Sequence, residues 1–215
     1  MFVKDRMSKH PLTIRADESV SAAHKYMKEQ QVRHLPVVDK KGKMVGLVTE
    51  DDLLRAGPSE ATSLSVWEIH YLLQRLQVSD AMIEKVITAP EDMPIEEAAG
   101  IMMEHKIGCL PVMRDGRLVG IITESDVFRT FMELFAARRR GLRVTLEVPD
   151  KQGELVRVAQ AVTDLGGYIA ACGAFVSDDP TKAGLVLKLT NVERAELVAA
   201  LSQIEGSEIV DVREH

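Results

Sequence analysis

The chain has 215 residues, 46% hydrophobic and 28% charged, which is the composition of a folded globular protein rather than a disordered one. A formal net charge of -6 argues against nucleic-acid binding, and no run of 18 apolar residues predicts a membrane span. Two distant cysteines, Cys109 and Cys172, do not form a disulfide framework, and residues 1–6 contain no apolar leader, so we expect a cytoplasmic protein.

The first half of the chain is an internal repeat. Residues 3–39 match residues 78–114 at an offset of 75 positions, as in Val3 and Val78. After one deleted loop residue the match continues at an offset of 74, as in Gly42 and Gly116. A register kept over about fifty residues does not arise by chance. One such unit is too small to bury a good core, so we expect the two copies to pack together.

Each copy predicts the same order of elements. A short apolar opening leads into an amphipathic helix, a strand, a tight turn, a second strand and a closing helix. The openings lie at 12–14 and 87–88, the first strands at 35–38 and 110–113, and the second strands at 44–48 and 118–122. Asp115-Gly116 in the second copy is a strong hairpin signal.

Both closing helices begin with the same pattern, Thr49-x-x-Asp52 in the first copy and Thr123-x-x-Asp126 in the second. One interpretation is a plain capping box, in which threonine and acid satisfy the first backbone N–H groups of the helix. The other is a ligand site, because a helix N-terminus attracts phosphate and a carboxylate accepts hydrogen bonds from ribose hydroxyls. Both interpretations remain open at this point.

The Leu-Pro-Val strands at 35–37 and 110–112, followed by Gly-hydrophobic-hydrophobic-Thr-x-x-Asp at 46–52 and 120–126, resemble a tandem pair of CBS domains, known as a Bateman module. The resemblance covers about residues 1–138. It implies an α/β (α+β) fold with a cleft that binds an adenine nucleotide (AMP, ADP or ATP) or S-adenosylmethionine. It also implies assembly into a homodimer.

The family resemblance carries over to sixteen positions, eight in each copy. The implied first nucleotide site consists of Leu12, Thr13, Val32, Arg33, His34, Pro36, Thr49 and Asp52. The implied second site consists of Ile87, Thr88, Ile107, Gly108, Cys109, Pro111, Thr123 and Asp126. In both, the threonine of the closing helix contacts phosphate and the aspartate holds the ribose.

The two copies differ just before the Leu-Pro-Val strand. The first has Arg33-His34, and the second has Gly108-Cys109 at the same place. Arginine and histidine are phosphate-binding donors, so we expect phosphorylated ligands to prefer the site that carries Arg33. The alternatives are a solvated surface charge for Arg33 and a strand-capping polar residue for His34.

Residues 56–77 predict a linker helix that is too apolar to be a bare connection. Trp67 and Tyr71 either pack on the repeats or form a dimer face. This segment resembles the AcuB-type acetoin-utilisation proteins. The closing helix of the second copy is expected to run to Arg140, and its basic end at 138–140 either complements the helix dipole or binds an anion.

From residue 141 the pattern becomes strand-helix-strand-strand-helix-strand, which predicts a ferredoxin-like domain over 141–215. Thr190 and Glu193 have capping-box spacing for its second helix. The domain resembles an ACT domain, which implies an amino-acid effector at the first strand-to-helix turn. The candidate effector residues are Asp150, Gln152, Gly153, Glu154 and Leu155. Alternatively, Asp150 and Gly153 only shape the turn.

The domain organisation is thus 1–55 and 78–140 for the repeats, 56–77 for the linker and 141–215 for the last domain. No catalytic motif and no metal-ligand spacing occurs among the six histidines and two cysteines. We expect a non-catalytic regulatory sensor that acts on an unidentified partner protein, without nucleic acid, membrane or metal. The alternative is a constitutive dimeric scaffold with vestigial clefts, and a third is an enzyme with an unrecognised site.

Overall fold

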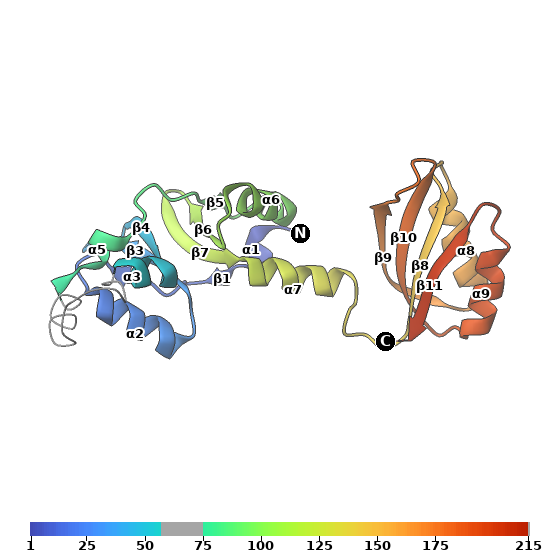
Figure 1. Cartoon of the computed structure of the whole chain (residues 1–215), viewed down its shortest axis with the longest axis horizontal. Helices are drawn as coiled ribbons and strands as arrows, with labels where there is room; N and C mark the ends of the chain where they lie inside the picture. Colours follow the sequence, from blue (N-terminus) through green and yellow to red (C-terminus); the bar gives the residue numbers. More distant parts are fainter. Residues whose placement is uncertain (57–74, 215) are drawn as a thin grey trace. The chain divides into compact units, whose positions relative to one another are not determined.

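The computed structural model describes residues 1–56 and 75–214, which form two compact units, 1–127 and 128–215 (Figure 1). The expected linker helix with Trp67 and Tyr71 falls mostly at 57–74, outside the described residues.

The N-terminal unit contains two sheets, one for each repeat. Strands β2, β3 and β4 form the first sheet, and the second has the order β1-β7-β6-β5. The elements of the first repeat are α1 (Val3–Arg6), β1 (Ser8–Lys9), β2 (Ile14–Arg15), α2 (Val20–Gln30), β3 (His34–Val38), β4 (Met44–Thr49) and α3 (Glu50–Ala56). Those of the second are α5 (Val78–Ala81), β5 (Ala89–Pro90), α6 (Ile95–His105), β6 (Cys109–Arg114), β7 (Arg117–Thr123) and α7 (Glu124–Leu134).

Local sequence signals explain these boundaries. Helix α2 begins where the Ser19 hydroxyl accepts a hydrogen bond from the amide of Ala22 at 3.1 Å, and it ends at Gln31 in the left-handed region. The β6–β7 turn places Asp115 and Gly116 at φ 51° and 73°, the positive values that a tight type I′ hairpin requires. The predicted repeat of helix and hairpin is confirmed.

The opening segments of the two repeats are exchanged. Ser8 of β1 pairs with Ile121 of the second repeat. At the equivalent place Ile83 pairs with Leu47 of the first repeat, and the two N···O distances of this second pairing are 2.8 and 3.0 Å. Helix α1 accordingly contributes a fully buried valine to the second core, and α5 contributes its own, Val78, to the first. Each core is therefore completed by the chain that precedes the other repeat.

Two equivalent glycines permit this exchange. A Cβ atom on Gly46 of β4 would lie 3.0 Å from the carbonyl oxygen of Ile83, and one on Gly120 of β7 would lie 3.1 Å from that of Ser8. Methionine side chains, Met82 at the first position among them, lie closer still. The absence of a side chain on β4 and β7 lets the crossing segment lie directly on the strand.

Helix α7 ends at Leu134, six residues before the expected end at Arg140. Ala136 adopts φ 47°, its amide donates to the carbonyl of Glu133, and the amide of Ala137 donates to Met132. This pair of bonds is a Schellman ending, with alanine where glycine is usual. The expectation that the basic run 138–140 closes the helix was therefore wrong.

The C-terminal unit has a four-stranded antiparallel sheet in the order β11-β8-β10-β9, with α8 and α9 on one side (Figure 1). Its elements are β8 (Leu142–Pro149), α8 (Glu154–Asp164), β9 (Tyr168–Val176), β10 (Lys182–Thr190), α9 (Arg194–Ser202) and β11 (Glu208–Glu214). Alternate β8 residues, Val144 and Leu146 among them, are fully buried under the helices. This is the predicted ferredoxin-like layout.

One detail of that prediction was wrong. Helix α9 begins after Glu193, which is itself the N-cap residue and makes no side-chain capping bond. Thr190 instead remains the last residue of β10, paired with Tyr168 of β9. The ladder to β9 keeps Thr190 extended, which prevents a capping box there.

Among the helices of the described residues, none combines the length and the apolar character that crossing a bilayer requires.

Candidate functional site

A cavity of about 460 Å³ lies in the N-terminal unit, where the end of β4 and the start of α3 face the second repeat. Its walls come from both repeats. The lining residues are Arg33, His34, Leu47, Thr49, Glu50, Asp51, Asp52, Arg55, Ile83, Lys85, Val86, Ile87, Lys106, Ile107, Gly108, Cys109 and Glu124. The volume is in the range of sites that hold a drug-sized ligand.

The cavity regroups the residues that the family resemblance assigned to two sites. Arg33, His34, Thr49 and Asp52 come from the implied first site. They face four residues of the implied second site, namely Ile87, Ile107, Gly108 and Cys109. The exchange of opening segments explains this, because the pairing of Ile83 with Leu47 carries residues 85–87 to the end of β4. This cavity therefore groups residues across the two repeats, and the assignment of a nucleotide site to each repeat stays a prediction.

The other eight assigned residues do not line this cavity. Leu12 and Thr88 are exposed, Pro36 and Pro111 are buried within β3 and β6, and Thr13, Val32 and Thr123 are partly buried. Asp126 is buried, with 7% of its surface exposed.

Both threonine–aspartate pairs form capping bonds. The Thr49 amide and hydroxyl donate to Oδ2 of Asp52 at 2.9 and 2.7 Å, and the Asp52 amide donates back to the hydroxyl at 3.2 Å. The Thr123 amide and hydroxyl donate to Oδ2 of Asp126 at 2.9 and 2.8 Å. The reciprocal capping box is thus present at α3, and at α7 the bonds from Thr123 to Asp126 are present. In the first pair one carboxylate oxygen, Oδ2 of Asp52, accepts both hydrogen bonds from Thr49. Asp52 also lines the cavity.

Four basic side chains line the cavity, and one of them, Arg33, was expected there from the sequence. Lys85 and Lys106 come from the second repeat, and Arg55 comes from α3. At the positions that match the two lysines, the first repeat has His10 and Gln31. A comparison of charged residues between the two copies could have identified Lys85 and Lys106 as site residues, because these lysines occur in the second copy alone.

His34 lines the cavity opposite Gly108. A Cβ atom on Gly108 would be 3.2 Å from its Nε2 atom, so a larger residue there would push the imidazole aside. Burial lowers the pKa of His34 below 6.5, the nearby Arg33 lowers it further, and the carboxylates of Glu124 and Asp52 oppose the shift. The imidazole is therefore neutral at pH 7 and can accept as well as donate a hydrogen bond.

Cys109 forms part of an apolar floor with Leu47 and Ile121. Burial raises the pKa of its thiol to about 12, with Glu124 adding to the effect. A protonated thiol is a poor nucleophile and a poor metal ligand. Within 1–56 and 75–214, no group of three His, Cys, Asp or Glu side chains is placed to hold a metal.

The expected effector turn of the C-terminal unit is held by local contacts. The Asp150 amide donates to the carbonyl of Thr181 at 2.9 Å, and Gly153 precedes α8 at φ 97°. Glu154 is buried at 4% exposure and pairs with Arg157 at 3.0 Å. Lys151 also pairs with it, at 3.4 Å. Gln152 is exposed, and Leu155 is half exposed. The turn-shaping interpretation accounts for these contacts.

Solved structures of similar fold include two that are relevant to the cavity. The CBS domain pair of protein MJ0100, in complex with 5'-methylthioadenosine and S-adenosyl-L-methionine, is 31% identical with a TM-score of 0.52, over 65% of this chain and 98% of that one. CBSX2 in complex with AMP is 28% identical with a TM-score of 0.51, over 64% and 98%. A Vibrio cholerae protein named as an acetoin utilization protein (AcuB) is 32% identical with a TM-score of 0.54, over 64% and 95%.

Among curated relatives, L-aspartate semialdehyde sulfurtransferase of Methanocaldococcus jannaschii is 34% identical over 131 residues, or 60% of this chain. Inosine-5'-monophosphate dehydrogenase of Nitrosopumilus maritimus is 34% identical over 122 residues, or 56% of this chain. The chain spans 23% and 22% of the lengths of these two enzymes.

The family model of the CBS domain matches residues 3–59 and 78–133, which is more than half of the chain and both copies of the repeat. The match agrees with the paired sheets, the repeated Thr-x-x-Asp helix starts and the cavity between the copies. This chain belongs to the CBS domain family.

Proposed function

We propose that the N-terminal unit is a regulatory sensor that binds a phosphorylated adenosyl ligand in the 460 Å³ cavity. Proteins of the CBS domain family are typically regulatory and non-catalytic, and two structural neighbours hold adenosyl ligands. The observation that carries the proposal is the convergence of Arg33, Lys85 and Lys106 on the cavity that also contains Thr49 and Asp52. Cations that can face an anion and a carboxylate that can face a sugar match the two polar ends of a nucleotide.

The floor of the cavity supports the same assignment. Cys109, Leu47 and Val86 form an apolar cluster, and Ile87 and Ile107 lie beside it. An adenine ring needs a flat apolar surface, which this cluster supplies. The neutral His34 adds a side chain that can hydrogen-bond with either a base or a hydroxyl.

The test is calorimetric titration of the whole chain with AMP, ATP and S-adenosylmethionine. The variant Lys106→Gln converts the residue to its counterpart in the other repeat. We expect it to weaken AMP and ATP binding about tenfold, and to leave S-adenosylmethionine, which lacks phosphate, within twofold. Lys28→Gln, on the exposed surface of α2, is the matched control.

A scaffold with vestigial clefts makes the opposite prediction. If none of the three compounds binds, or if Lys28→Gln weakens AMP as much as Lys106→Gln does, the cavity is not the nucleotide site. Sensing further requires that the ligand bind two states of the protein unequally.

The finer features of the proposal rest on resemblance. We propose that the chain forms a homodimer, that the C-terminal unit is an ACT-like module with an amino-acid effector at 150–155, and that the regulated process includes acetoin metabolism. The first is tested by sedimentation. The second is tested by titration with the amino acids, where equal heats for wild-type protein and for Gln152→Ala would count against that turn.

A further inference from the structure

The sheet of the C-terminal unit has a second face, turned away from α8 and α9. On β8 the buried residues alternate with partly exposed ones, and Arg143, Thr145 and Glu147 face this open side. The strand register places side chains of neighbouring strands in rows across the face. One of these rows is basic, and another contains two glutamates.

One row consists of three cations. Lys188 of β10 is directly opposite Arg143 of β8, and Arg143 is directly opposite Arg213 of β11. Like charges in directly opposed positions destabilise a sheet. Lys188 is buried at 4% exposure, and its ammonium donates to the carbonyl of Gly141 at 3.3 Å. Burial lowers its pKa, and Arg143 lowers it further. Such a row is costly unless an anion faces it.

Asp211 contacts two members of this row, Arg213 and Arg143. It accepts from Arg213 at 2.7 and 2.9 Å and lies 3.7 Å from Arg143. This end of the face therefore brings the three basic side chains of the row together beside Asp211.

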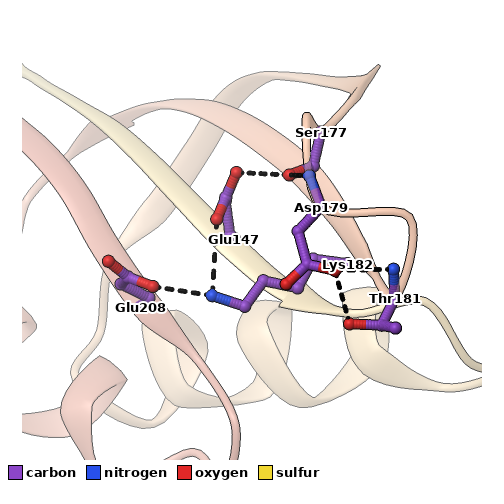
Figure 2. Close-up of polar contacts among 6 residues, drawn as sticks. All are labelled: Glu147, Ser177, Asp179, Thr181, Lys182 and Glu208. Carbon is purple, nitrogen blue, oxygen red and sulfur yellow. Dashed lines mark hydrogen bonds and ion pairs between the residues drawn. The ribbon is translucent and has the colours of Figure 1, made fainter.

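The strand register places Glu147 and Glu208 at the other end of the face, and Figure 2 shows their contacts with Lys182 and Ser177. The Lys182 ammonium lies 2.6 Å from Glu208 and 3.5 Å from Glu147. The second oxygen of Glu147 accepts from the Ser177 hydroxyl at 2.5 Å, and that hydroxyl accepts from the amide of Asp179 at 3.1 Å. This network fixes the two glutamates away from the cation row, so they do not neutralise it.

An apolar groove of about 850 Å³ adjoins the cation row within the C-terminal unit. Phe131 and Phe135 stack with ring centroids 4.7 Å apart, and both line the groove with Phe175 and Val186. A Cβ atom on Gly173 would lie 2.5 Å from the ring of Phe135, so this glycine lets the ring rest on the sheet. Arg143, Lys188 and Arg213 line the same groove.

We propose that this groove binds an amphipathic organic anion, a small carboxylic acid with an apolar body. The carboxylate faces the row of Lys188, Arg143 and Arg213, and the body lies on the phenyl rings and on the strip of β9 at Gly173. The occupant follows from charge and surface together: a cation row selects a negative head, and an aromatic groove selects an apolar tail. None of residues 150–155 lines the groove, so this site is separate from the expected effector turn and from the nucleotide cavity.

The experiment is calorimetric titration of the whole chain with four probes: octanoate, octylammonium, octanol and acetate. We expect octanoate to bind with one site per chain. Octylammonium has the same tail and the opposite charge and is expected not to bind. Octanol and acetate, which lack the charge and the tail respectively, are expected to bind at least tenfold more weakly. Octylammonium binding as tightly as octanoate would overturn the proposal without any variant.

Variants locate the site. Lys188→Met is expected to weaken octanoate binding tenfold or more, since a hydrogen-bonded charge pair is lost. Lys182→Met, on the same strand and the same face but in the glutamate network, is expected to change it less than twofold. Circular dichroism and a thermal melt verify folding, and Arg143→Gln replaces Lys188→Met if that variant does not fold. Unchanged octanoate affinity in the folded cation variant would reject the site.

A second copy of the chain is the competing occupant. If octanoate does not bind, and if the protein sediments as a dimer that Phe175→Asp converts to a monomer, the face is an interface between copies and the proposal fails. AMP binding is measured in the same samples. The nucleotide cavity lies in the other unit. Loss or retention of AMP binding is therefore independent of the octanoate result.

Discussion

Asp52 and Asp126 occupy equivalent positions, and each accepts hydrogen bonds from the amide and the hydroxyl of its threonine, yet their surroundings differ. Asp52 lines the cavity, and Asp126 is buried at 7% exposure. Loss of the helix cap costs about 1 kcal/mol at either aspartate. Comparing substitutions at the two positions therefore tests whether Asp52 also binds a ligand.

We predict that Asp52→Asn weakens binding of both AMP and S-adenosylmethionine, about tenfold or more, since both ligands carry a ribose and a neutral amide holds its hydroxyls less well. Asp126→Asn is expected to leave AMP affinity at the cavity within twofold. Titration calorimetry on both variants decides this. Equal losses in the two variants would mean that the cap, and not the cavity, accounts for the effect.

His34 makes stability depend on pH. Its pKa is lowered in the folded protein by burial and by Arg33, so the unfolded chain binds its proton more readily. The stabilisation is therefore complete above pH 6.5 and is lost as pH falls through the lowered pKa. Urea unfolding between pH 8 and pH 5 is expected to show a steeper loss of stability in wild-type protein than in His34→Gln. Parallel curves would contradict this assignment.

At the scale of elements, the exchange of opening segments rests on two strand glycines. We predict that Gly46→Val destabilises the N-terminal unit by about 1–3 kcal/mol, because the new side chain meets the carbonyl of Ile83 and the crossing segment must move. Gly100→Ala is the control. This glycine lies inside α6 with nothing within 4 Å of a new Cβ, so alanine there is expected to stabilise by about 0.5–1 kcal/mol.

Denaturant unfolding measures both variants. A Gly46→Val protein as stable as wild type would show that the crossing segment can leave β4 at no cost, and the cavity wall at 85–87 would then lose its anchor.

Element identity was well predicted from the sequence because each strand and helix carries its own periodic signal. Asp115-Gly116, for example, correctly predicted the hairpin turn between β6 and β7. Two boundaries failed for a tertiary or conformational reason. Thr190 is held in β10 by its ladder, and Ala136 adopts a positive φ that its residue type does not announce.

The composition of the cavity was only half predicted. Arg33, His34, Thr49 and Asp52 were found because a motif or a contrast between copies marks them. Lys85 and Lys106 were not assigned. Lys85 follows the pairing of Ile83 with Leu47, which joins segments far apart in the sequence, and Lys106 comes from the end of α6 in the other repeat. Local patterns contain no information on which repeat a crossing segment will join.

At the scale of the whole molecule, the two compact units have separate cores. We predict two unfolding transitions by calorimetry, of which AMP at 100 times its dissociation constant stabilises one by about 2.7 kcal/mol. Leu146→Ala, in the core of the C-terminal unit, is expected to destabilise the other by about 2–5 kcal/mol. A single transition moved by both changes would instead mean that the units unfold together.

The exchanged openings also dictate an order of events during biosynthesis. When the first sheet has left the ribosome, its hydrophobic interior still lacks Val78, and the N-terminal Val3 has no completed interior to enter until β7 has been made. The nascent first half therefore waits for the second, and a chain released early exposes apolar surface that chaperones recognise.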